Sequence, residues 1–215
     1  MNRTDAAWVA GRLTIGTAVR ILARLRVYGA ERMPMTGGLV VAANHFSWGD
    51  PAALGTASPR NLYFMAKIEA LRVPGLGEFA RSLGAFPVRR GESDREAVRT
   101  MRQIVRDGHA LGLFVEGTRQ PGVLGRAQPG AAMVAINEEV PVIPVAIHGS
   151  HRWRFWNLAP VSVAWGQPMT FEGLPRGGKG YREASVEIER KLEGLWQWLV
   201  ELHALGRPRD ATPPT

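Results

Sequence analysis

Hydrophobic residues along the chain follow two alternating patterns. Short continuous apolar runs, bounded mostly by Gly, Pro or polar residues, predict strands at 39–43, 61–66, 85–88, 111–115, 142–147 and 161–165. Segments with apolar residues every three or four positions predict helices over 6–26, from 51 onward, and over 92–107, 131–137 and 181–204. Because strands and helices alternate, we expect an α/β fold with one sheet flanked by helices.

The length of the chain favours one domain. Its 215 residues allow one sizeable core, which we place at 27–205, after an N-terminal helix at 1–26. The polar, Pro-containing residues 206–215 predict a disordered tail. Pro144 lies inside an otherwise buried strand, and it predicts a bulge or a sheet edge at that point.

The N-terminal helix has an apolar face interrupted by arginines. Trp8, Ile15, Val19 and Leu22 share that face, while the basic residues of the segment are Arg3, Arg12, Arg20, Arg24 and Arg26. Two interpretations stay open: a helix lying on an anionic membrane, or a helix packed on its own domain. No apolar run approaches the roughly 18 residues of a membrane-spanning helix.

The amino-acid composition excludes several kinds of site. The chain has no cysteine, which excludes a disulfide framework, a thiolate zinc site and a cysteine nucleophile. The formal net charge is +8, carried almost wholly by arginine. Arginine forks suit phosphate and carboxylate groups, so the candidate partners are a phosphorylated ligand, an anionic membrane or nucleic acid. No nucleic-acid-binding motif accompanies the charge, and we expect no nucleic-acid partner.

The candidate chemistry begins with His45 and Asp50, directly after the strand at 39–43. Their spacing can bring an imidazole and a carboxylate together where a strand leads into a helix, a common location for ligand sites. A carboxylate fixes the imidazole tautomer, and the other ring nitrogen can then take a proton from a hydroxyl. Alternatively, Asp50 is only the N-cap of the helix that begins at Pro51.

Weaker signals lie elsewhere. Two further strands end in arginine-containing segments, Gly84–Arg89 and Phe114–Arg119, and an arginine there can hold a phosphate through two hydrogen bonds. Each alone is an ordinary strand end. His148 and His151 lack zinc-protease spacing and are predicted to be loop histidines. Four tryptophans are predicted to lie in the core or an interface: Trp153, Trp156, Trp196 and Trp198.

Together the segments resemble the glycerolipid acyltransferase family. His45 and Asp50 match its His-x4-Asp motif, and Gly84–Arg89, Phe114–Arg119 and Val140–Ile147 match its second, third and fourth motifs in order. The resemblance covers about Val27 to Pro168. Val115 and Ala127–Gly130 depart from the family's usual residues and leave the acceptor open.

The resemblance implies a glycerol-3-phosphate acyltransferase-like fold and an acyltransferase activity. His45 is expected to act as general base and Asp50 to orient it. The expected substrate-binding residues are Lys67, Arg89, Glu116, Gly117, Thr118 and Arg119, with the arginines on the phosphate of a lysophospholipid.

The resemblance also implies the partners. We expect lysophosphatidic acid as acceptor, acyl-CoA or acyl carrier protein as donor, no cofactor or metal, and a peripheral position on the cytoplasmic face of an anionic membrane. Another lysolipid or glycolipid acceptor stays open, as does a non-enzymatic basic module on a membrane surface.

Overall fold

A computed structural model describes residues 3–88, 95–120 and 122–215 of the chain. Its strands are β1 (Arg26–Tyr28), β2 (Leu39–Ala43), β3 (Leu62–Lys67), β4 (Phe86–Val88), β5 (Ala110–Phe114), β6 (Val142–His148) and β7 (Ser162–Trp165). Its α-helices are α1 (Arg3–Gly11), α2 (Thr17–Leu22), α3 (Asp50–Ala57), α4 (Ile68–Leu71), α5 (Leu76–Ser82), α6 (Arg95–Arg106), α7 (Gly130–Glu138) and α8 (Gly178–Ala204). A π-helical stretch, η1 (Arg12–Gly16), joins α1 to α2, and 3-10 turns lie at η2 (Ala30–Arg32) and η3 (Ser150–Arg152).

The strands form one sheet in the order β1-β7-β6-β2-β5-β3-β4. All neighbours are parallel except β6 and β7. The carboxyl ends of β3, β5, β2 and β6 therefore meet at one edge of the sheet, where open α/β sheets hold their ligands. This confirms the predicted fold class.

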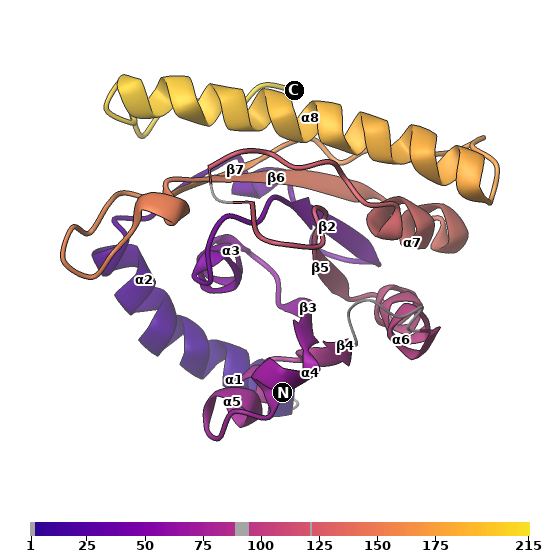
Figure 1. Ribbon diagram of the computed structural model, residues 1–215, viewed down its shortest axis with the longest axis horizontal. Helices are drawn as coiled ribbons and strands as arrows, with labels where there is room; N and C mark the ends of the chain where they lie inside the picture. Colours follow the sequence, from indigo (N-terminus) through magenta and orange to yellow (C-terminus); the bar gives the residue numbers. More distant parts are fainter. Residues whose placement is uncertain (1–2, 89–94, 121) are drawn as a thin grey trace.

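Successive residues of the central strands supply two cores because side chains alternate between the faces of a sheet. In β2, Val40 and Ala42 pack under α6, α7 and α8, whereas Leu39, Val41 and Ala43 pack against α3 and the N-terminal helices. Figure 1 shows α8 along one face of the sheet and the α1–α2 segment along the other. Helices covering both faces explain why the strands appear in the sequence as unbroken apolar runs.

Most predicted elements are present, and the differences concern short ones. The N-terminal helical segment ends at Leu22 rather than at residue 26, because β1 begins at Arg26 and pairs with β7. The sequence pattern did not predict β1, α4 or α5. These elements have three, four and seven residues, too few to establish a clear period, and β1 becomes a strand only through its partner.

Pro144 lies in a central strand, so the predicted sheet edge is wrong. It pairs with Ala42 of β2, and its carbonyl accepts a hydrogen bond from the Gly166 N–H at 2.9 Å. Val145 pairs with Trp165, and Val142 pairs with Met169. Three steps along β6 therefore face four steps along the neighbouring chain. The additional residue is the predicted bulge, and it lies where Pro144 has no N–H to donate.

The N-terminal helical segment packs on its own domain through the face that carries Trp8. The Trp8 side chain is 5% exposed, lies against Gly55 of α3, and donates a hydrogen bond from Nε1 to the Leu83 carbonyl at 3.1 Å. The opposite face exposes Val9, Leu13 and Ile21. The segment therefore buries one apolar face and leaves a second apolar face uncovered.

The terminal residues 206–215 contact the domain, which differs from the expected disordered tail. Arg32 donates hydrogen bonds to the carbonyls of Pro213, at 2.6 Å, and of Pro214, at 2.9 Å. Arg207 is buried and donates to the carbonyl of Arg24 at 3.0 Å. Guanidinium groups from distant parts of the chain satisfy carbonyls that the local sequence leaves free.

Candidate active site

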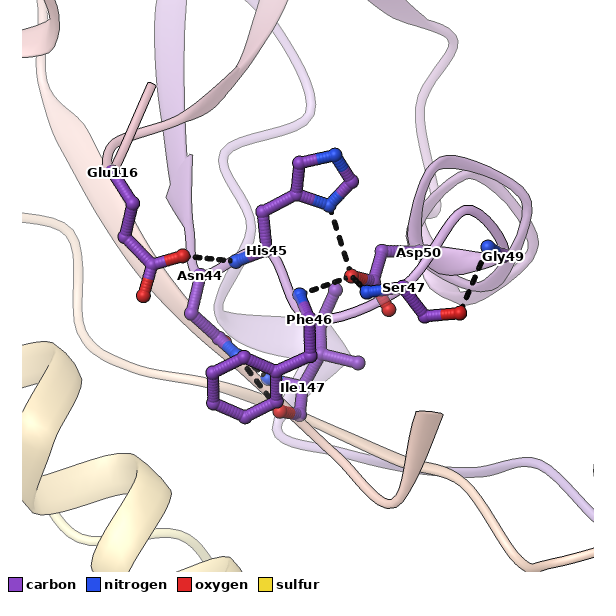
Figure 2. Close-up of polar contacts among 8 residues, drawn as sticks. All are labelled: Asn44, His45, Phe46, Ser47, Gly49, Asp50, Glu116 and Ile147. Carbon is purple, nitrogen blue, oxygen red and sulfur yellow. Dashed lines mark hydrogen bonds and ion pairs between the residues drawn. The ribbon is translucent and has the colours of Figure 1, made fainter. Parts of the chain in front are cut away.

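His45 and Asp50 form a hydrogen-bonded pair in the loop between β2 and α3. The distance between His45 Nδ1 and Asp50 Oδ2 is 3.0 Å, and Figure 2 shows the second ring nitrogen on the side of the imidazole away from the carboxylate. Asp50 is completely buried, while His45 stays 9% exposed. The Phe114 ring stacks on the imidazole at 4.1 Å between centroids. The pair therefore has an oriented imidazole with one nitrogen left for a substrate.

Asp50 holds the loop together and does not cap the helix. Its Oδ2 atom also accepts hydrogen bonds from the backbone N–H groups of Phe46 and Ser47, each at 2.6 Å. Helix α3 begins at Asp50 itself, and its N-cap, Gly49, makes no side-chain cap bond. The predicted capping role is wrong, because the carboxylate turns back into the loop that carries His45. Three polar groups of the loop therefore converge on one carboxylate oxygen.

Glu116 fixes the backbone of His45 from the neighbouring strand. Because Ala43 pairs with Phe114, the residues that follow β2 and β5 lie side by side. The carboxylate of Glu116 accepts hydrogen bonds from the N–H groups of His45 and Gly125, both at 2.8 Å. The pKa of Glu116 is raised to about 7, mainly by burial and to a smaller extent by the Asp50 charge, while the two hydrogen bonds oppose the rise.

Asn44 connects the same loop to the strand on the other side. Its side-chain amide donates to the Ile147 carbonyl at 2.9 Å, and its Oδ1 accepts from the Ile147 N–H at 2.7 Å. Figure 2 shows Asn44 extending from the loop toward Ile147, and Glu116 reaching the His45 N–H from the segment after β5. His45 is thus positioned by the Glu116 carboxylate on its own N–H and by the bonds of the neighbouring Asn44 to β6, in addition to the bond between its ring and Asp50.

A cavity of about 610 Å³ opens beside this loop. The carboxyl ends of four neighbouring strands supply its wall, which consists of Phe46, Ser47, Trp48, Lys67, Thr118, Arg119, His151 and Arg154. Among the described residues, this wall contains three basic side chains, Lys67, Arg119 and Arg154, and no carboxylate. The Arg119 guanidinium lies 3.9 Å from the centroid of the Trp48 ring, a cation–π contact that orients the arginine. The cavity suits a ligand with an anionic group.

The structure brings together most of the residues that the sequence indicated. Lys67, Thr118 and Arg119 line the cavity, whereas Glu116 lies beneath the His45 loop and acts on its backbone. Gly117 has φ +70°, a conformation that suits glycine and permits the turn between Glu116 and Thr118. Arg89 lies outside the described residues.

Sequence reasoning missed the contribution of the segment after β6. His151 lies in the 3-10 turn η3 between β6 and β7, consistent with its predicted loop position, and it lines the cavity together with Arg154. His148 is the last residue of β6 and is buried, so its predicted loop position is wrong. The resemblance ended its fourth motif at Ile147, and no local pattern indicated that the chain beyond it returns to the site.

The dyad, the four strand ends and the cationic cavity define an enzyme that transfers a group to or from a hydroxyl. Residues 24–148, more than half of the chain, match the Acyltransferase family. A 1-acyl-sn-glycerol-3-phosphate acyltransferase of Bacillus subtilis is 30% identical over 193 residues, which cover 83% of this chain and 96% of that protein. The chain therefore belongs to the acyltransferase family.

Two other relatives show the range of that likeness. A lyso-ornithine lipid O-acyltransferase of Pseudomonas aeruginosa is 38% identical over 144 residues, covering 63% of this chain and 53% of the relative. The crystal structure of a 1-acyl-sn-glycerophosphate acyltransferase from Thermotoga maritima superimposes with a TM-score of 0.66 at 24% identity, covering 88% of this chain and 78% of that one. At this identity, the match to the Thermotoga maritima structure supports the fold alone.

The described residues contain neither a metal-binding cluster nor a membrane-spanning helix. Within residues 3–88, 95–120 and 122–215, no group of three or more His, Asp or Glu side chains is arranged to hold a metal ion. In the same part of the chain, no helix has both the length and the apolar character needed to cross a bilayer.

Proposed function

We propose that this acyltransferase esterifies the free hydroxyl of a lysophospholipid, with lysophosphatidic acid as acceptor and phosphatidic acid as product. The observation that carries the proposal is the oriented His45–Asp50 pair beside a cavity whose described wall has cations and no carboxylate. Arg119, Arg154 and Lys67 complement a phosphate monoester. A lyso-ornithine lipid, the acceptor named for one relative, is the second candidate, since its carboxylate is also an anion.

The reaction needs two proton transfers, one from the acceptor hydroxyl to His45 and one from His45 to the leaving thiolate. Nε2 of His45 takes the proton of the acceptor hydroxyl, and the oxygen attacks the carbonyl carbon of the acyl thioester. The carbon–sulfur bond then breaks, and the leaving thiolate receives the proton from the imidazolium. Asp50 stabilises the imidazolium formed between the two steps. The donor is a thioester of coenzyme A or of acyl carrier protein, and no cofactor takes part.

Replacing the base tests the mechanism. His45→Ala should lower kcat by roughly 10²–10⁴-fold, the typical contribution of a general base. Release of free thiol from acyl-CoA, measured with and without lysophosphatidic acid, gives the rate and the acceptor dependence. Lyso-ornithine lipid, assayed in parallel, distinguishes the two acceptors. Turnover close to that of the unchanged protein would rule out His45 as the base.

Transfer should be direct, without an acyl-enzyme. Ser47 is the hydroxyl nearest to the dyad in the loop, and its Oγ accepts a hydrogen bond from the Gly49 N–H at 3.3 Å. That contact supports a role in the turn. Intact-mass measurement after mixing with donor alone should show no adduct, whereas a stoichiometric acyl group on Ser47 would indicate nucleophilic catalysis.

The acceptor resides in a bilayer, and we propose that the protein binds the cytoplasmic face of an anionic membrane peripherally. The uncovered face of the N-terminal segment offers Val9, Leu13 and Ile21, with Arg20 and Arg24 at its end. Trp8 is packed inside, so it does not take the membrane-facing role that its position in the sequence suggested. Co-sedimentation with vesicles should require anionic lipid and weaken at high salt.

A further inference from the structure

Three large aromatic side chains lie exposed beside the cavity. Trp48 is 76% exposed, Phe155 is 74% exposed and Trp156 is 83% exposed. Trp48 lines the cavity, and Phe155 and Trp156 directly follow Arg154, which also lines it. A single exposed aromatic residue is ordinary, but three beside one cavity mark a contact surface. Trp156 was expected in the core or an interface, and the structure excludes the core.

Phe155 and Trp156 stand in a hydrogen-bonded turn, here termed the aromatic loop (residues 153–158). The side-chain oxygen of Asn157 accepts hydrogen bonds from the N–H groups of Arg154, at 2.8 Å, and Ala159, at 3.0 Å. The Leu158 N–H donates to the Arg154 carbonyl at 3.0 Å. These bonds hold the turn together from within, and the two aromatic side chains project from it with high exposure.

The aromatic loop is joined to the N-terminal helical segment. Trp153 donates a hydrogen bond from Nε1 to the Leu22 carbonyl at 3.0 Å, and Ile21, next to Leu22, is exposed. Figure 1 shows the loop after η3 beside the end of α2, while α8 covers the other face of the sheet. The aromatic loop and the uncovered face of the N-terminal segment therefore belong to one side of the molecule.

The charges around the aromatic loop select its partner. Arg119 is stacked on Trp48, and Arg154, which lines the cavity, directly precedes Phe155 and Trp156 in the chain, so basic residues accompany the exposed aromatic ones. Aromatic rings with a polar edge favour the boundary between headgroups and acyl chains, and guanidinium groups bind anionic headgroups. A surface of this composition complements the interfacial layer of an anionic bilayer.

We propose that the aromatic loop inserts Phe155 and Trp156 into the interfacial layer of an anionic membrane and so holds the mouth of the cavity against the bilayer. The proposal rests on the lysophospholipid acceptor proposed above. An acceptor drawn from the leaflet then reaches the cavity without its acyl chain crossing water. The N-terminal segment supplies attachment, and the aromatic loop sets the orientation.

Vesicle binding by a double variant tests the insertion. Phe155→Ser with Trp156→Ser should weaken partitioning into vesicles of phosphatidylcholine and phosphatidylglycerol by roughly tenfold, from the apolar area returned to water. The matched control is Val186→Ser on α8, an apolar side chain that is 67% exposed on the other side of the sheet. It should change partitioning by less than about twofold. Equal partitioning of the double variant and the unchanged protein overturns the proposal.

A fluorophore on a single introduced cysteine gives a second measurement of insertion, in which Phe155 stays in place. The chain has no cysteine, so Trp156→Cys provides a unique attachment point for an environment-sensitive fluorophore. Emission at position 156 should shift to shorter wavelength when anionic vesicles are added, and emission from Val186→Cys should not. No shift at position 156, or a dimer in light scattering that the double variant dissociates, overturns the membrane assignment.

Activity separates this proposal from the proposed function. The double variant should lose rate on lysophosphatidic acid embedded in vesicles and keep its rate on a short-chain, monomeric acceptor, because neither substituted side chain lines the cavity. An equal loss on both acceptors overturns the insertion proposal while the acyltransferase function stands. If the unchanged protein acylates neither lysophospholipid nor lyso-ornithine lipid, the proposed function fails, and vesicle partitioning still decides the insertion.

Discussion

At the scale of single residues, the site depends on one oxygen atom. Asp50 Oδ2 faces the His45 ring and two backbone N–H groups, while Oδ1 is buried and makes no hydrogen bond among the described residues. The same carboxylate thus orients the imidazole and shapes the loop. Substitution of Asp50 by Asn separates these two contributions. It removes the charge, but the amide oxygen can still accept the hydrogen bonds from the backbone N–H groups.

Asp50→Asn should therefore lower kcat by roughly 10⁴-fold, as expected when an orienting carboxylate becomes neutral, while the loop keeps its fold. A steady-state assay on lysophosphatidic acid measures kcat, and thermal unfolding checks the loop and helix α3. A variant that unfolds at much lower temperature would indicate a mainly structural Asp50. A stable variant with nearly unchanged kcat would contradict the dyad.

Arg119 offers a second test at this scale. Arg119→Lys keeps the charge but loses both the planar stacking on Trp48 and the two-pronged hydrogen bond, so the KM for the acceptor should rise by roughly tenfold. The value of kcat should change much less. An acceptor without the phosphate serves as control, and an equal rise in its KM would count against phosphate recognition by Arg119.

At the scale of elements, the N-terminal helical segment is part of the domain's core as well as a candidate membrane contact. Trp8→Ala should lower the free energy of unfolding by about 3–5 kcal/mol, because it leaves a cavity between α3 and the Leu83 region. Denaturant titration measures this. Leu13→Ala, on the exposed face, should cost less than about 0.5 kcal/mol. Similar costs for both variants would mean that the segment is not packed as described.

At the scale of the whole molecule, two histidines, His148 and His203, connect the ends of three elements. His148 ends β6 and lies 4.5 Å, between ring centroids, from His203 near the end of α8, and the His203 ring is 2.9 Å from Ser162 Oγ of β7. The pKa is lowered to about 4 for His148 and to about 3 for His203, mainly by burial and to a smaller extent by neighbouring histidines and arginines. Neutral imidazoles therefore belong to the folded state.

Stability should consequently fall as the solution becomes more acidic. Well above pH 6.5 both histidines are neutral in the folded and unfolded states, so their contribution to the free energy of unfolding is fully present. Between pH 6.5 and about 4 the unfolded chain gains protons that the folded protein does not, which costs on the order of 3 kcal/mol for His148 alone. Denaturant titrations across this range measure the loss.

The substitution His203→Gln separates the contribution of the histidines to the pH dependence of stability from the contributions of other groups. The raised pKa of Glu116, about 7, acts in the opposite direction, since its folded form binds a proton more readily than the unfolded form between pH 4.5 and 7. His203→Gln removes one titrating ring and should reduce the dependence of stability on pH relative to the unchanged protein. An identical dependence in the two proteins would contradict the assignment to His203.

Local pattern was sufficient for the central strands and for the pairing of His45 with Asp50. Leu39–Ala43 is buried on both sides and so is apolar throughout, and five residues of chain are short enough for an imidazole and a carboxylate to meet within one loop. The four motifs in order also carried the acyltransferase assignment, and the fold and the family match confirm it. These features depend on neighbours in the sequence.

The features that only the tertiary structure decided depend on residues far apart in the chain. Glu116 reaches the His45 backbone because β5 lies beside β2, and Arg154 enters the cavity because β6 runs parallel to β2 on its other side. Likewise, Trp8 faces inward because Gly55 leaves room for its ring. Such contacts follow from strand order and packing, which are set by the burial of the whole core, and no periodicity within a short segment contains that information.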